Sequence, residues 1–159
     1  MIKITLIALG KLKEKYLVEA VNEYKKRLSG YCNLEIIELE PVRISDKPSE
    51  KQIEAALLKE AEDIIKRIPQ NSAVYPFCVE GKGLSSPAFA NEISACANEG
   101  KSIVFIIGSS YGLSEKIKAL GKRKLSVSEM TFPHQLFRVM VLEQIYRAFK
   151  INEGSAYHK

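Results

Sequence analysis

The sequence predicts an α/β protein with a mostly parallel sheet and helices on both faces. Short apolar segments rich in β-branched residues alternate with amphipathic helical segments along the chain. Residues 102–107 are almost wholly apolar, which is typical of a strand buried on both faces. The 159 residues suffice for one domain, residues 1–159, with a sizeable core.

Two strands and a helix are predicted near the start of the chain. Residues 3–9 form an apolar strand that ends at Gly10, and residues 34–39 form a second strand. Between them, apolar residues spaced by three or four predict a helix over residues 14–28. Residues 40–48 carry two prolines and are predicted to be a loop.

A second helix and a third strand follow. Ser49 and Gln52 have the spacing of a capping box, and the apolar pattern behind them continues to Ile68 before Pro69. Residues 73–79 form the third strand, and the glycine-containing residues 80–83 are predicted to be a loop.

The remaining elements have clear start signals. Ser86 is predicted to cap a helix that has Pro87 in its first turn and runs to Asn98. After the buried strand at residues 102–107, Ser114 caps a short helix. Residues 124–128 form the last strand.

The last predicted helix, residues 136–151, has an apolar arc that covers more than half of its circumference. A helix of this kind is buried on two sides, so we expect one side to face the sheet and the other a partner subunit in a homodimer. The arc consists of Phe137, Val139, Val141, Leu142, Ile145, Tyr146 and Phe149.

The composition, 46% hydrophobic and 27% charged, is that of an ordinary globular protein, and no apolar run approaches the ~18 residues of a membrane span. We therefore expect no membrane partner. The formal charge of +5 is compatible with an anionic partner. Basic residues gather at residues 11–15 and 116–124, although such clusters are equally compatible with a solvated surface.

Several classes of site are disfavoured. The three cysteines show no Cys-x-x-Cys spacing and there are only two histidines, so neither a disulfide framework nor a metal site is predicted, and a reducing cytoplasm is expected. The chain has no Gly-x-Gly-x-x-Gly motif, phosphate-binding Gly-x-x-x-x-Gly-Lys loop, Gly-x-Ser-x-Gly elbow or His-Glu-x-x-His pair.

A ligand pocket is predicted at one edge of the sheet. In open parallel sheets ligands bind beyond the carboxyl ends of strands, and three such ends carry glycine or small polar residues, at residues 77–83, 107–112 and 127–134. Each glycine alone is more simply explained as a turn residue. Three such loops at one edge favour a pocket.

Five segments resemble the RlmH family, the SPOUT-class methyltransferases that act on N3 of a pseudouridine in large-subunit rRNA. They are residues 3–13, 105–113, 125–135, 143–150 and 157–159, and the likeness covers the whole chain. The resemblance implies a C-terminal trefoil knot, a homodimer, a ribosomal substrate and the cofactor S-adenosyl-L-methionine. The family commonly has Gly-Gly after the fourth strand, where this chain has Gly108 and Ser109.

The resemblance also implies which residues bind the cofactor. They lie in the three loops at the predicted sheet edge and are Phe77, Gly108, Val127, Ser128, Glu129, Met130, Thr131 and Phe132. Apolar walls with a few backbone hydrogen bonds suit an adenine ring.

Three further residues are candidates for catalysis. His134 begins the last helix, where free N–H groups favour a neutral imidazole that can act as a base, or it is a corner histidine bonded to the backbone. Arg147 can contact RNA, or form a surface ion pair with Glu143 four residues earlier. Tyr157 can stack on the target base, or belong to a frayed end.

Three functions follow from these observations. The first is methylation of rRNA, and the second is RNA binding by a scaffold without catalytic activity. The third is a small-molecule α/β enzyme, which predicts no salt-dependent association with RNA. Binding of S-adenosyl-L-methionine distinguishes the first function from the second.

Overall fold

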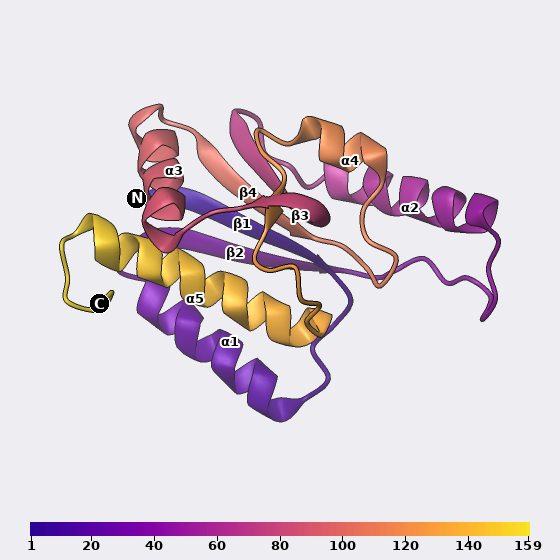
Figure 1. Cartoon of the computed structure of the whole chain (residues 1–159), viewed down its shortest axis with the longest axis horizontal. Coiled ribbons are helices and arrows are strands. Elements are labelled where there is room, and N and C mark those ends of the chain that lie inside the picture. The colour runs from indigo at the N-terminus through magenta and orange to yellow at the C-terminus, as the bar shows by residue number, and fades with distance from the viewer.

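A computed structural model describes residues 1–159. Five strands form one sheet of order β2-β1-β4-β3-β5, and every neighbouring pair is parallel. Helices cover both faces of the sheet (Figure 1). The predicted α/β class is therefore confirmed.

The strands and helices alternate along the chain. They are β1 (Ile2–Leu9), α1 (Lys15–Leu28), β2 (Cys32–Leu39), α2 (Glu50–Ile65), β3 (Ser72–Gly83), α3 (Ser86–Asn98), β4 (Ser102–Ile107), α4 (Glu115–Leu120), β5 (Leu125–Ser126) and α5 (His134–Asn152). No helix in the structure combines the length and the apolar character that crossing a bilayer requires.

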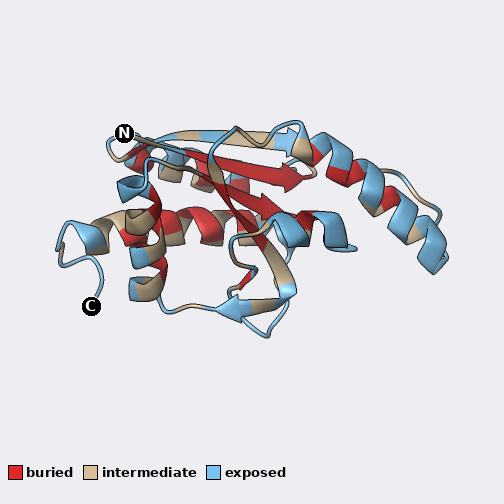
Figure 2. Ribbon diagram, turned by 90° about the horizontal axis from the view of Figure 1, so that it is seen from above, coloured by how far each residue is buried: buried red, intermediate tan, exposed pale blue.

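The core has two parts because successive side chains of a strand point to opposite faces. On one face, Ile103, Phe105 and Ile107 of β4 pack with α1, α3 and α5. On the other, Val104 and Ile106 pack with α2 and α4. Figure 2 shows the central strands buried and the outer side of α2 exposed. Burial of β4 on both faces matches its apolar sequence.

The wide apolar arc of α5 has an explanation within the chain. Helix α5 packs against both α1 and α3 as well as the sheet (Figure 1). Its buried residues are Arg138, Val141, Leu142, Ile145 and Ala148. Because two neighbouring helices cover most of the arc, the arc alone does not require a partner subunit.

The predicted loop at residues 80–83 is wrong: these residues continue β3 to Gly83. After a register shift, Lys82 and Gly83 pair with Leu125 and Ser126 of β5, and this long-range pairing extends the strand. The last strand is shorter than the predicted residues 124–128. It ends early because the Ser126 hydroxyl donates to the Ser128 carbonyl, which turns the chain.

Two helix ends also differ from the prediction. Helix α2 stops at Ile65 rather than Ile68, since the chain tightens into turns before Pro69. The cap of α3 is Ser85 rather than Ser86, because the Ser85 hydroxyl accepts the hydrogen bond from the Ala88 N–H. The capping box of Ser49 and Gln52 is present as predicted.

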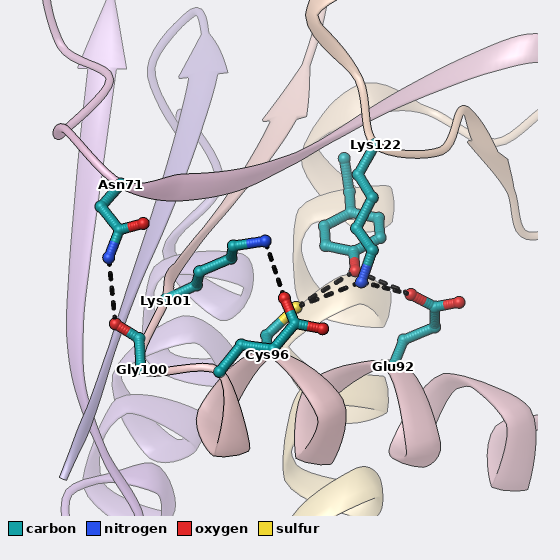
Figure 3. A network of polar contacts seen from close by, with 8 residues as sticks. Asn71, Glu92, Cys96, Gly100, Lys101 and Lys122 are labelled. Atoms are coloured by element: carbon teal, nitrogen blue, oxygen red, sulfur yellow. Dashed lines mark hydrogen bonds and ion pairs between the residues drawn. The ribbon is translucent and has the colours of Figure 1, made fainter.

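The segment that leads into β5 is held by one carboxylate of α3. Glu92 accepts a hydrogen bond from the buried Tyr75 hydroxyl at 2.8 Å and pairs with Arg123 at 3.0 Å. Lys122 lies 3.6 Å from the same carboxylate, and Figure 3 shows the two side chains pointing toward each other. These contacts tie the chain just before β5 to β3 and α3.

Candidate active site

A cavity of about 340 Å³ lies at the carboxyl ends of β3, β4 and β5. Because β3 lies between β4 and β5 in the sheet, its residues Phe77 to Glu80 meet the loops that follow β4 and β5 there. All eight residues predicted to bind the cofactor line the cavity, namely Phe77, Gly108, Val127, Ser128, Glu129, Met130, Thr131 and Phe132. The tertiary structure thus brings together residues that are up to 55 positions apart in the sequence.

Gly108 has no room for a side chain. A Cβ atom at this position would lie 2.4 Å from the Gly112 carbonyl oxygen and 2.9 Å from the Leu113 side chain. The loop closes tightly over Gly108 because the Gly112 N–H donates to the Ser109 carbonyl at 2.9 Å. This turn forms one wall of the cavity.

The opposite wall is the loop after β5. The Met130 N–H donates to the Ser128 hydroxyl at 3.0 Å, so a serine side chain stabilises the conformation of this loop. Ser128, which was predicted to bind the cofactor, therefore also stabilises the fold of this loop. The loop presents Val127 and Met130 as exposed apolar side chains at the mouth of the cavity.

His134 lies at the rim of the cavity. It is the first residue of α5, which begins two residues before the predicted start at residue 136, and its side chain is exposed. An exposed imidazole does not fit the alternative of a buried corner histidine. Its position leaves the ring nitrogens accessible to a bound substrate.

Arg138, which the sequence analysis did not select, anchors the start of α5. Its guanidinium is 2% exposed and donates to Glu38 at 2.6 Å and to the Gly10 carbonyl at 2.9 Å. These bonds hold the helix to the ends of β1 and β2, one turn after His134. The sequence did contain one indication of this role, because Arg138 is a charged residue on the apolar face of the helix.

Arg147 and Tyr157 lie away from the cavity within one chain. Arg147 follows His134 by thirteen residues of continuous helix, about 20 Å at roughly 1.5 Å per residue. It forms the predicted ion pair with Glu143, at 2.7 Å, and its guanidinium stacks 4.7 Å from the centre of the Tyr157 ring. The structure therefore separates these two residues from His134.

The C-terminal tail folds back onto α5. Gly154, with φ of +74°, turns the chain, and the Ser155 N–H donates to the Lys150 carbonyl in a Schellman arrangement. The Tyr157 ring then packs edge-on against Tyr146, and its hydroxyl donates to Glu143 at 2.9 Å. Burial and this hydrogen bond raise the pKa of the Tyr157 hydroxyl.

Three further titratable groups line the cavity, namely Cys78, Glu80 and Lys118. Burial, assisted by the charge of Glu80, raises the pKa of the Cys78 thiol. Lys118 pairs with Glu80, and its hydrogen bond lowers the pKa of that carboxyl group. Cys78 lies in the predicted part of β3, whereas Glu80 lies in the extension of the strand that local sequence patterns did not reveal. The structure contains no cluster of histidine, cysteine or acidic side chains suited to a metal ion.

A family model described as "Predicted SPOUT methyltransferase" matches residues 2–158. The chain therefore belongs to the SPOUT methyltransferase family. The parallel sheet fits this fold and its C-terminal trefoil knot. A crystal structure of the A. aeolicus TrmH/SpoU tRNA modifying enzyme has the same fold, with a TM-score of 0.51 and 10% identity over 97% of this chain and 78% of that chain.

Two relatives are far more similar in sequence. A protein of Clostridium acetobutylicum called ribosomal RNA large subunit methyltransferase H is 51% identical over 157 residues, 98% of this chain and 99% of the relative. A protein of the same name from Clostridioides difficile is 47% identical over the same shares of both chains. The resemblance inferred from five sequence segments is confirmed.

Proposed function

We propose that this protein transfers a methyl group from S-adenosyl-L-methionine to N3 of a pseudouridine in large-subunit rRNA, on the assembled ribosome in the cytoplasm. The observation that carries the proposal is the cavity beside the second half of β3 and the loops after β4 and β5, which all eight expected cofactor residues line. The similarity to two proteins named for methylation of large-subunit rRNA supports the substrate.

The cavity suits the cofactor in size and in lining. Its volume of about 340 Å³ lies within the range of small-molecule sites. Phe77 and the apolar residues of the loop after β5 offer walls for an adenine ring, and the turn after Gly108 offers backbone groups. S-adenosyl-L-methionine supplies an activated methyl group when bound. The residues that line the cavity would hold the cofactor and position it for transfer to the acceptor nitrogen.

His134 is assigned to accept the proton from N3. An imide nitrogen must lose its proton to attack, and a neutral imidazole can take that proton near neutral pH. The exposed ring at the cavity rim can reach a nucleobase that lies over the cofactor. The start of α5, held by Arg138, fixes the position of the backbone that carries it.

In this proposal the complete active site is formed by two copies of the chain. Exposed apolar side chains surround the cavity mouth, with Val79 96% and Met130 77% exposed. Such a patch is typical of a protein interface. A second copy docked here would bring its own Arg147, Tyr157 and tail toward a cavity that they cannot reach within one chain.

A charge placed in this patch is expected to break the dimer. Because Val79 contacts solvent in the single chain, Val79→Asp should leave the fold intact, whereas an unpaired carboxylate buried at an interface is strongly destabilising. We expect sedimentation at micromolar protein to give a dimer for the natural chain and a monomer for Val79→Asp. Leu58→Asp, on the exposed side of α2, is the matched control and should remain dimeric. A folded natural chain that sediments as a monomer would refute the dimer.

The cofactor is expected to protect Cys78 from alkylation. With its pKa raised, the thiol holds little thiolate at neutral pH, so its reaction with iodoacetamide should accelerate as the pH rises through and above the ordinary thiol range. S-adenosyl-L-methionine should slow this reaction at every pH, because Cys78 lines the cavity. Mass spectrometry can follow each cysteine, with the buried Cys32 and Cys96 as internal controls. Equal rates with and without cofactor would contradict the pocket assignment.

The function is tested by methyl transfer from labelled S-adenosyl-L-methionine to ribosomes, separate large subunits and naked rRNA in parallel. We expect label in rRNA of the assembled ribosome, at N3 of a pseudouridine. Cofactor binding without transfer to any of the three would favour an RNA-binding scaffold. The absence of both cofactor binding and salt-dependent RNA association would favour a small-molecule enzyme.

A further inference from the structure

Helix α2 contributes one buried carboxylate that touches the cavity wall from behind. Glu60 is 4% exposed. One of its oxygens accepts a hydrogen bond from the Ser109 hydroxyl at 3.2 Å, and the other accepts one from the Val42 N–H at 2.9 Å. Ser109 belongs to the turn after β4 that lines the cavity. A single side chain thus joins the loop after β2, helix α2 and the loop after β4.

Packing alone does not favour a carboxylate at this position. None of the ion pairs in the chain includes Glu60. Burial of a carboxylate without a cation costs free energy that an apolar residue of similar size would avoid. Its two hydrogen bonds are therefore the contribution that distinguishes Glu60 from a leucine or methionine.

The contact with Ser109 lies where the turn is most constrained. On the cavity side, the Gly112 carbonyl leaves no room for a Cβ atom at Gly108, and the Gly112 N–H donates to the Ser109 carbonyl. On the far side, a small space of about 60 Å³ lies between Glu60, the loop after β2 and the residues Ser109, Ser110 and Tyr111. Without the bond to Glu60, this space would allow the turn to move away from the cavity.

We propose that Glu60 is a positioning residue for the cofactor, which acts through Ser109 by holding the turn at residues 108–112 in its binding conformation. The inference rests on the proposed function in that the ligand of the cavity is S-adenosyl-L-methionine. Glu60 itself does not line that cavity. Its effect is on cofactor affinity, because a turn that is already in place needs no ordering when the ligand binds.

The bond to Val42 gives this arrangement a second consequence. Because both oxygens of one carboxylate are used, the loop at residues 40–48 and the cofactor turn share an anchor. Ordering one segment therefore favours order in the other. Binding of the cofactor should slow amide exchange at Val42, although the loop after β2 does not line the cavity.

Four variants test the role of Glu60 by calorimetry with S-adenosyl-L-methionine. Ser109→Ala removes only the hydroxyl and should weaken binding about three- to tenfold, the range for one net hydrogen bond. Glu60→Ala should weaken it by at least as much, and the double variant should bind no more weakly than Glu60→Ala, since one bond cannot be lost twice. Glu60→Gln should bind almost as the natural chain does, because the amide oxygen can accept from the Val42 N–H while the amide N–H donates to the Ser109 hydroxyl. Glu54→Ala, at an exposed site on the same helix, is the control and should change nothing.

Steady-state kinetics separate positioning from general damage. We expect KM for the cofactor to rise in Ser109→Ala while kcat at saturating cofactor stays within about twofold, since the bound turn is the same once it is filled. Cofactor affinity unchanged in Ser109→Ala would overturn the inference, even if Glu60→Ala is unstable. If the natural chain binds no S-adenosyl-L-methionine, the proposed function is wrong. Faster amide exchange at residues 108–112 in free Ser109→Ala than in the free natural chain then supports the positioning role, and equal exchange overturns it.

Discussion

Deletion of residues 157–159 is expected to lower methyl transfer by roughly two to four orders of magnitude, the range for loss of a positioned catalytic group. The tail contributes little to the fold of its own chain. Tyr157 rests on the surface of α5 through Tyr146, Arg147 and Glu143, and it follows a turn at Gly154 that already ends the helix. The thermal melt and the sedimentation of the truncated chain should therefore remain nearly unchanged.

The large effect follows from the chemistry of the tail. A tyrosine ring can stack on a nucleobase, and Arg147 with Lys159 can neutralise phosphate charge beside it. In the single chain Arg147, against which Tyr157 stacks, lies about 20 Å along α5 from His134, so in a dimer these two residues would serve the cavity of the other copy. The tail would then order the target nucleotide over the cofactor.

Two smaller changes show which part of the tail acts. Deletion of Lys159 alone removes one charge and leaves the contacts of Tyr157, so it should have a much weaker effect. Tyr157→Phe keeps the ring but loses the hydroxyl, and it separates stacking from hydrogen bonding. Full activity in the chain that lacks residues 157–159 would show that the tail has no catalytic role and would leave His134 as the remaining candidate.

Gly108→Val is expected to weaken binding of S-adenosyl-L-methionine by between about five- and 150-fold. The Cβ atom would lie 2.4 Å from the Gly112 carbonyl oxygen, so the turn must open and change the wall of the cavity. Forcing atoms into a well-packed region costs about 1–3 kcal/mol, which corresponds to this range of affinities. Calorimetry measures the effect directly.

The clash also sets the controls for this prediction. Because the Cβ atom alone makes the close contacts, Gly108→Ala should show most of the loss. Gly30→Ala is the matched control, since nothing lies within 4 Å of a Cβ atom there, and it should bind the cofactor normally. Unchanged affinity in Gly108→Val would mean that the cofactor does not lie against this turn.

The sequence alone was sufficient to predict the elements whose signals are local. The capping box at Ser49 and Gln52, the cap at Ser114 and the apolar strand at residues 102–107 each arise from neighbouring residues, and the structure contains all three. The parallel class followed from the alternation of such elements. The segments at residues 77–83, 107–112 and 127–134 correctly indicated one shared edge, since parallel strands end on the same side of a sheet, although the first segment belongs to β3 itself.

Contacts between distant residues were decided only by the tertiary structure. The extension of β3 to Gly83 depends on pairing with β5, more than 40 residues later, so the local glycines predicted a loop instead. Arg138 meets Glu38 across 100 residues, and Glu60 meets Ser109 across 49. The apolar periodicity of α5 does not predict that Arg138 bonds to Glu38, and that of α2 does not predict that Glu60 bonds to Ser109. Each bond forms only after separate elements have packed against the sheet.

The separation of the candidate catalytic residues has the same cause. In the sequence, Arg147 and Tyr157 stand close to His134, and all three were assigned to one site. Thirteen residues of rigid helix extend about 20 Å, so His134 and Arg147 are near in the sequence but distant in space. The residues of the cofactor cavity are instead far apart in the sequence and close in space. Phe77 and Phe132 are 55 positions apart and line the same cavity. Residue types and local spacing determined which chemistry the chain carries, whereas helix rigidity and strand order determined which of those groups can act together.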